Sequence, residues 1–331
     1  MKRFRFFLVV FTTVFACMAV PAVGLTTTFT GDYDDNWNDG RNWDERVPFA
    51  TDDAVIPADQ TPHIKRNETG VCKTIALAGT LLLKKDSVLT LGHADYDEST
   101  ISGTMTIGKQ DDPNHGPATL KISEDHIIIG DYGTIELVRN SVIEDAGDPG
   151  DGLLTIEGVS EADCSKDDRP LIEDSLVITG VGSIKVALQN EAYVVAGPPG
   201  VLVLADHDKD SNCCGSWIAE EGGELGVQCL VEGTGTWRAQ DDDYEDDDYL
   251  GGTITIGYDG TAGCVLSDGP VYVNGFDAVL GVTATGYFCT DGNLRFQSVL
   301  YDEDQKTNPM IWVAPDGGAE FGVCNDVQCP E

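Results

Sequence analysis

The chain is dominated by very short runs in which Ile, Leu or Val alternates with another residue before a glycine or an acidic residue interrupts the pattern. Three clear examples follow one another at residues 75–77, 81–83 and 89–91. A period of two places the apolar side chains on one face of a β-strand. No long stretch shows the 3.6-residue period of an amphipathic helix. The chain is therefore predicted to be all-β.

The alternation recurs along most of the chain, at Met105/Ile107, Leu120/Ile122, Ile127/Ile129, Ile135/Leu137, Leu154/Ile156, Leu176/Ile178, Ile184/Val186, Leu202/Leu204, Leu225/Val227, Ile254/Ile256 and Val271/Val273. Many runs stop at a glycine, namely Gly79, Gly92, Gly108, Gly130, Gly180 or Gly257. Glycine tolerates the positive φ that a solenoid corner requires. We therefore predict a single-stranded, right-handed parallel β-helix of unequal coils. An antiparallel β-sandwich or jelly roll fits the same alternation and is the alternative.

The first 24 residues have the pattern of a secretory signal. Three basic residues within the first five precede the apolar run 6–20, and Ala22 and Gly24 supply the small residues of a cleavage site. The apolar run is short for a transmembrane span, and no later segment is long enough for one. We predict that the mature protein is secreted or held at the cell surface, without membrane insertion after the signal is cleaved.

A spaced set of aromatic, proline and acidic residues follows the signal. Trp37, Asn42–Trp43, Val47–Pro48 and the run Asp52–Pro57 (DDAVIP) come in that order. This segment resembles the opening of secreted bacterial β-helix proteins of the pectin-lyase-like and autotransporter-passenger kind, and more remotely the G8 module. The resemblance covers residues 31–57 and continues loosely to Leu91. It implies a capped β-helix and export, but no specific activity.

The resemblance and the alternation together suggest a division of the chain. We expect a signal peptide at 1–24, an N-terminal cap with the first strands at 25–71, and a β-solenoid at 72–331. Acidic loop insertions are expected at 206–216 and 240–250.

The tryptophans have two interpretations. Trp37 and Trp43 are suitable material for a lid over the open first coil, which would otherwise expose strand edges and core. Alternatively, Trp37, Trp43, Trp217 and Trp237 stack on sugar rings and form a ligand-binding surface.

The chain is strongly acidic, with 57 Asp and Glu against 20 Lys and Arg and a formal net charge of -37. Such a charge repels nucleic acid and anionic membranes. It attracts divalent cations, for which carboxylate oxygens are good ligands. We therefore expect no nucleic-acid partner, and we expect divalent cations and extracellular glycans or matrix as partners.

Two acidic segments are candidate Ca²⁺ sites. The first is a run of seven carboxylates at Asp241, Asp242, Asp243, Glu245, Asp246, Asp247 and Asp248. The second has the alternating start of a calcium loop, at Asp206, Asp208 and Asp210. It departs from the EF-hand pattern because Ser211 replaces the turn glycine and Trp217 replaces the bidentate Glu. In both cases the alternative is a solvated acidic loop.

The chain has ten cysteines. In an exported protein these residues form disulfides by default. Cys324 and Cys329 enclose a short C-terminal loop, and we predict that they pair with each other.

No catalytic motif stands out. A Gly-x-Ser-x-Gly elbow is absent, and paired acids carry little weight where acids are so numerous. We therefore expect an exported structural or binding protein with an acidic, Ca²⁺-binding surface. The alternative is a polysaccharide lyase, a glycoside hydrolase or a carbohydrate-binding module on a β-helix scaffold.

Overall fold

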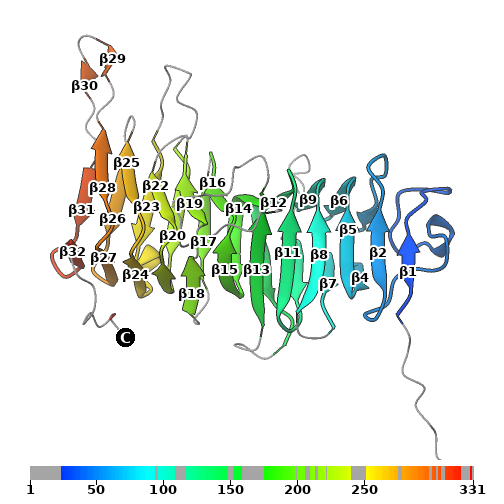
Figure 1. The fold of residues 1–331 in the computed structure, drawn as a ribbon. Coiled ribbons are helices and arrows are strands. Elements are labelled where there is room, and N and C mark those ends of the chain that lie inside the picture. Colours follow the sequence, from blue (N-terminus) through cyan, green and yellow to red (C-terminus); the bar gives the residue numbers. More distant parts are fainter. Residues whose placement is uncertain are drawn as a thin grey trace, which may run out of the picture.

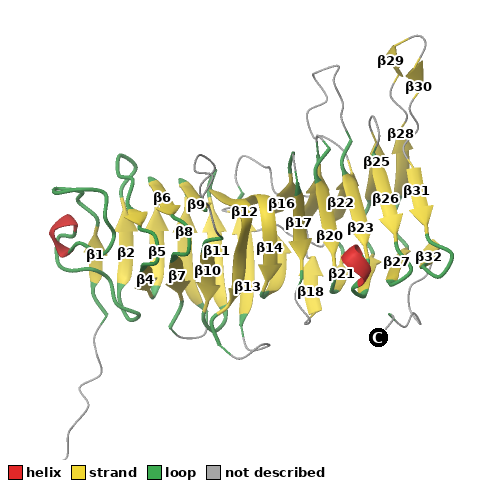
Figure 2. Ribbon diagram, turned by 180° about the vertical axis from the view of Figure 1, so that it is seen from behind, coloured by secondary structure: helices red, strands yellow, loops and turns green. Residues whose placement is uncertain are grey.

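The structure, a computed structural model, describes residues 24–331 except 94–95, 109–116, 148–151, 159–174, 199, 206–208, 213–214, 221, 240–250, 275–277, 298–299, 303–304, 307–309, 322–328 and 330–331. Residues 1–23, which hold almost all of the predicted signal, lie outside the described part. The described chain winds into one long parallel β-helix, seen from the side in Figure 1. Figure 2 shows the same tube from behind. No helix among the described residues is long and apolar enough to cross a membrane.

Three strands make up each coil, and each contributes to one of three faces. Face 1 is the twelve-stranded sheet, formed by β1 (Thr26–Thr28), β2 (Asp53–Ile56), β5 (Thr74–Leu77), β8 (Asp97–Ile101), β11 (His126–Gly130), β13 (Leu153–Gly158), β15 (Ala187–Glu191), β18 (Lys209–Asn212), β21 (Leu230–Gly233), β24 (Gly263–Ser267), β27 (Gly286–Thr290) and β32 (Gly318–Phe321).

Faces 2 and 3 are the two halves of the larger sheet. Face 2 contains β3 (His63–Ile64), β6 (Thr80–Leu83), β9 (Thr104–Ile107), the start of β12 (Thr134–Asp145), the start of β14 (Val177–Lys185), β16 (Tyr193–Ala196), β19 (Ser216–Ala219), β22 (Thr236–Ala239), β25 (Val271–Asn274) and β28 (Leu294–Gln297). Face 3 contains β4 (Thr69–Cys72), β7 (Val88–Leu91), β10 (Thr119–Ile122), the ends of β12 and β14, β17 (Val201–Leu204), β20 (Glu224–Val227), β23 (Thr253–Ile256), β26 (Val279–Val282) and β31 (Met310–Val313).

The parallel pairing decides between the two predicted folds. Successive coils pair in parallel, as β2 does with β5 and β5 with β8. The only antiparallel ladder among the described strands joins β29 (Leu300–Asp302) to β30 (Gln305–Lys306), a hairpin that projects from the C-terminal coils in Figure 1. The predicted β-helix is therefore confirmed, and the antiparallel sandwich is excluded.

The predicted alternation generates the core. In β5, β6 and β7 every second residue is buried, which makes Ile75 and Leu77 core residues as expected. Parallel register stacks these side chains, so that Ile56, Leu77 and Ile101 occupy equivalent positions on three successive coils. Full burial of each such side chain contributes about 1.5–3 kcal/mol. The columns of apolar side chains therefore hold the coils together.

Strand β11 reverses one predicted orientation. We expected Ile127 and Ile129 to point inward, but His126, Ile128 and Gly130 are the buried residues. The run from Ile127 to Ile129 is apolar throughout, so alternation could not fix its phase. The phase is set by pairing with β8, where Ser99 lies opposite Ile128.

The N-terminal cap is an interlocked aromatic cluster. Phe29 and Trp43 pack edge to face with ring centroids 5.2 Å apart, and Trp37 and Trp43 do the same at 4.9 Å. The Trp43 indole N–H also donates to the Trp37 carbonyl at 2.7 Å. All three side chains are buried. The short helix η1 (Gly40–Asn42) lies in the same cap, visible as the red helix beside β1 in Figure 2.

Two buried polar side chains explain why the motif of the cap has Asn and Asp at fixed places. The Asn42 side chain accepts from the Tyr33 and Asp34 backbone N–H groups and donates to Asp34 Oδ1. The Asp52 carboxylate is fully buried and receives two-pronged hydrogen bonds from Arg46. The motif therefore encodes a loop structure that is held by hydrogen bonds.

Candidate functional site

The structure places only part of the predicted calcium residues. The acidic run Asp241–Asp248 and the pair Asp206 and Asp208 lie outside the described residues. Asp210 is described, and it is buried inside the tube on β18. Its carboxylate accepts from the Leu188 N–H at 2.8 Å and from the Cys229 thiol at 3.2 Å. The prediction of Asp210 as an outward calcium ligand is therefore corrected, because strand alternation turns it into the core.

All four tryptophans proposed for ligand stacking are core residues. Trp37 and Trp43 belong to the cap, and Trp217 and Trp237 point into the tube from adjacent coils of face 2. The last two rings stack with centroids 5.7 Å apart and planes inclined by 25°. The sugar-stacking interpretation of these residues is therefore corrected, because none of them presents an open ring face to a ligand.

A polar cluster with catalytic residue types lies inside face 1, and sequence reasoning did not identify it. Register places Asp97 opposite His126 on β8 and β11. Ser99 Oγ and His126 Nε2 are 2.8 Å apart, and the Ile75 N–H donates to the same hydroxyl at 3.0 Å. Lys73 Nζ lies 3.3 Å from Asp97 Oδ1 at the edge of the cluster.

The electrostatics of the cluster favour a neutral imidazole. Burial lowers the pKa of His126 to about 4, while the negative charge of Asp97 opposes that shift. Gly92 is at the adjoining corner with a φ of +97°, and a Cβ there would lie 2.2 Å from the Ser123 carbonyl oxygen. The glycine therefore permits both the turn and the close approach of the next coil's backbone.

The geometry differs from that of a serine-nucleophile triad. In such a triad the acid accepts a hydrogen bond from the imidazole and the serine hydroxyl reaches the substrate. Here His126 Nδ1 has no hydrogen-bond partner among the described residues, and Ser99, His126 and Asp97 are all buried. The cluster therefore connects three successive coils of the core. It does not present a nucleophile to solvent.

An arginine–tyrosine ladder lies on the outer side of face 2. Tyr272 of β25 is the register partner of Arg238 on β22 and of Arg295 on β28. The two guanidinium carbons lie 5.3 and 5.4 Å from the centre of the tyrosine ring. This arrangement joins positive charge to an aromatic surface on a very acidic molecule. A search for basic residues at outward strand positions could have found it.

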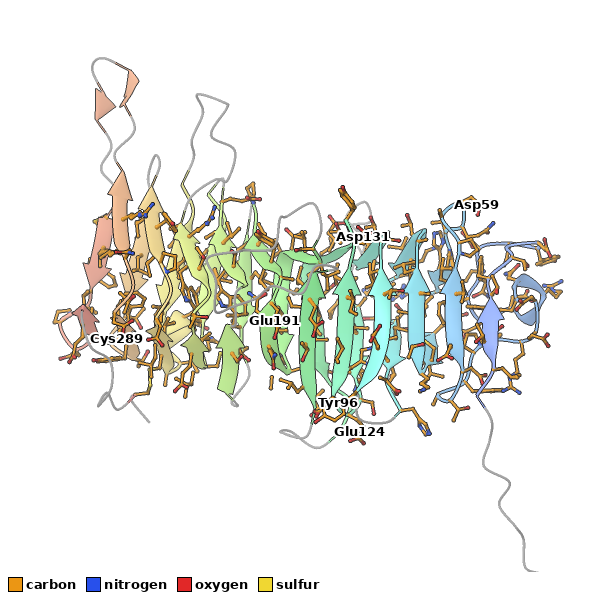
Figure 3. The ribbon with its side chains drawn as sticks, in the orientation of Figure 1. Asp59, Tyr96, Glu124, Asp131, Glu191 and Cys289 are labelled. Atoms are coloured by element: carbon orange, nitrogen blue, oxygen red, sulfur yellow. A yellow bond between two sulfur atoms is a disulfide. The ribbon has the colours of Figure 1, made fainter. Side chains whose placement is uncertain are left out.

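Carboxylates meet at the corner between face 1 and face 2. Burial raises the pKa of Asp268, and the nearby charges of Asp291 and Glu232 raise it further. Figure 3 shows other acids on the outside of the tube, with Glu191 on face 1 and Glu124 beside Tyr96 at a corner. Across the described residues, however, no group of three or more His, Cys, Asp or Glu side chains has a geometry that could hold a metal ion.

The disulfide prediction is wrong in its pairing. Cys329 is bonded to Cys264 of β24, with the two Cα atoms 5.7 Å apart, so it does not pair with Cys324. The coiled fold brings together residues that are 65 positions apart, which sequence proximity cannot reveal. Cys289 on β27 is also in a disulfide, whereas Cys72 and Cys229 are buried thiols.

Comparisons with protein-family models, curated proteins and solved structures find no match to this chain. The likeness of residues 31–57 to secreted bacterial β-helix proteins therefore remains a prediction.

Proposed function

We propose that the chain is an exported structural or binding protein, a β-helical rod that displays carboxylates outside the cell and recruits Ca²⁺. The observation that carries this proposal is that the strands of the three faces point aromatic and other core side chains into the tube and acidic side chains out to solvent. Trp217, Trp237, Ser99 and His126 are buried inside the tube, while acids such as Glu124 and Glu191 lie on its outside (Figure 3). A long rod with a net charge of -37 holds many carboxylates at fixed separations.

Two further features support export and cation binding. A protein with disulfides such as Cys264–Cys329 suits an oxidising compartment. Dense carboxylates repel one another, and Ca²⁺, which takes six to eight oxygen ligands, relieves that repulsion. Binding that favours the folded state raises the melting temperature by mass action.

The test is thermal melting of the mature protein after exhaustive chelation and again with Ca²⁺ in the low millimolar range. We expect the melting temperature to rise, and to rise more than in NaCl or MgCl₂ of equal ionic strength. A variant with the seven acids of 241–248 changed to Asn or Gln is expected to lose most of this excess. The control for charge alone is a variant in which seven exposed acids elsewhere are changed in the same way, namely Asp32, Asp59, Glu98, Glu124, Asp131, Asp259 and Asp316. An equal response to all three salts would contradict calcium recruitment.

The arginine–tyrosine ladder supports a second candidate function, the binding of acidic glycans. Guanidinium groups bind carboxylates through paired hydrogen bonds, and an aromatic ring between them offers a stacking surface. Tyr272 and the exposed Trp312 belong to different faces, so they do not form one aromatic platform. Calorimetric titration with uronate oligosaccharides tests the idea. Arg295→Ala is expected to weaken binding, and Lys121→Ala, a basic residue of face 3, is the control. The absence of binding by the unaltered protein would remove this candidate.

A further inference from the structure

The C-terminal end of the tube is open. Val282 of β26 is completely buried, whereas Val313, its register partner on the last coil, is 38% exposed. Ile311 and Ala319, the other inward residues of that coil, are half-buried. These residues occupy core columns, and their exposure follows from the lack of a further coil over them among the described residues.

The strand β31 concentrates apolar surface at this end. Met310 is 52% exposed and Trp312 is 50% exposed, and together with Val313 they place three exposed large hydrophobic residues in one four-residue strand. Trp312 lies against Gly281 of the preceding coil, where a Cβ would be 3.9 Å from the indole ring. β31 pairs with β26 on one side, and its other edge is at the end of the stack. An edge strand that is apolar and uncharged is a template for pairing with another chain.

Cys329, close to the end of the sequence, is bonded away from this end. Cys329 is bonded to Cys264 on β24, and β24 is followed along face 1 by β27 and then by β32 of the last coil. The bond therefore holds Cys329 two coils back from the last strand of face 1.

Charge limits the places where a second copy can dock. A net charge of -37 opposes side-by-side contact between two rods, because acidic flanks would face each other. Contact through the ends keeps the bodies of the rods pointing apart, and salt screens charges beyond about 8 Å at physiological ionic strength. β31 itself has the sequence Met-Ile-Trp-Val and carries no charge. Asp316 and Glu320 are exposed in the same coil, so the repulsion between two ends lies beside β31 and not on the strand itself.

We propose that two copies of the chain dock through their C-terminal ends, with the free edge of β31 against the same edge of the second copy. In a twofold arrangement the two β31 strands run antiparallel, so that their free N–H and C=O groups bond to each other. The contact covers Met310, Trp312 and Val313 on both copies. It uses up both open ends, so assembly stops at a dimer of about twice the length of one rod. The proposal does not depend on calcium.

The test is sedimentation of the mature, disulfide-intact protein from about 1 to 200 μM in about 0.5 M NaCl, a range that detects micromolar dissociation constants. We expect the mass to double with concentration, and the dimer to weaken at low salt. A monomer throughout would overturn the proposal, and so would growth beyond a dimer.

Variants locate the contact. Trp312→Lys and, separately, Met310→Lys are expected to raise the dissociation constant about tenfold or more, because large side chains at the centre of an interface carry most of its affinity. Tyr96→Lys is the matched control, since Tyr96 is 71% exposed at a corner near the middle of the rod. Melting curves establish that each variant is folded. A dimer unaffected by both β31 variants, or equally weakened by Tyr96→Lys, would place the contact elsewhere and contradict the proposal.

Discussion

The two ends of the rod are built from the same alternating strands, but only the N-terminal end is covered by a cap. At the N-terminal end Phe29, Trp43 and Trp37 pack edge to face over the first coils and are buried. At the C-terminal end Trp312 and Val313 face solvent. Each coil of a solenoid is stabilised by its two neighbours, so a terminal coil lacks half of its contacts unless something covers it. The comparison teaches that the alternation specifies the tube, whereas the treatment of each end is specified by separate residues.

The largest effect is expected from removing the cap. Trp37→Ala deletes a buried indole and its edge-to-face contact with Trp43, and it should cost about 3–5 kcal/mol. Trp312→Ala, the equivalent truncation at the open end, should change stability by about 0.5 kcal/mol or less in dilute monomer. Urea unfolding followed by circular dichroism measures both. An equal loss of unfolding free energy in the two variants would show that the two ends do not differ in their contribution to stability.

The C-terminal disulfide should have the next largest effect. Cys329→Ser removes the bond to Cys264, and the loss of a disulfide costs about 2–4 kcal/mol. We expect the coils around β24, β27 and β32 to become sensitive to protease while the cap stays resistant. The matched change at the other end of the chain is Trp37→Ala. In this variant the cap should become sensitive to protease while the C-terminal coils stay resistant. Loss of resistance along the whole rod after Cys329→Ser would contradict local anchoring.

A smaller, pH-dependent effect is expected from the interior of the N-terminal half. Burial lowers the pKa of His126 from about 6.5 to about 4, so the folded state favours the neutral ring. The resulting stability is complete above pH 6.5 and declines as the pH falls toward 4. The loss amounts to about 1–3 kcal/mol. His126→Gln should flatten the pH dependence of the melting temperature in this window, although it also removes a packed ring.

The C-terminal coils of the rod serve as the control for the prediction on His126. The same inward column passes through Asp210 and ends in Val231, Val265 and Phe288, which do not titrate. The raised pKa of Asp268 adds stability to the C-terminal coils as the pH falls, so their protease sensitivity should not increase between pH 6.5 and 4.5. A pH dependence that persists in His126→Gln would assign it to another group.

The smallest effect is expected from the outer surface. Lys121 and Glu144 are register partners on face 3, with Nζ and Oε1 3.2 Å apart and both side chains about one-third exposed. Exposed pairs of this kind contribute about 0–1 kcal/mol. Lys121→Ala should thus leave the melting temperature almost unchanged. A large loss would mean that surface pairs, and not the core columns, hold the coils together.

The fold could be predicted because it follows from local rules. Alternation placed Ile75 and Leu77 in the core. Of the six glycines expected at corners, Gly92, Gly108, Gly180 and Gly257 have a positive φ, whereas Gly79 and Gly130 do not. The phase of β11 could not be predicted, because Ile127–Ile129 is apolar throughout and only its partner β8 sets which residues point inward.

The candidate sites were harder to predict than the fold. Trp217 and Asp210 were expected outside, but strand phase turns both into the core. Cys264 and Cys329 become neighbours only after several coils have formed. The polar cluster of Ser99 and His126 also depends on the register between coils. Long-range register is therefore the physical information that the sequence patterns lacked.

Hydrogen exchange resolved by coil is the most direct test of the contrast between the ends. In dilute protein we expect slow amide exchange in β2 and β5, next to the cap, and fast exchange in β28 and β31 at the open end. At high concentration β31 alone should become protected. Equal protection at both ends in dilute protein would show that the two ends do not differ in stability.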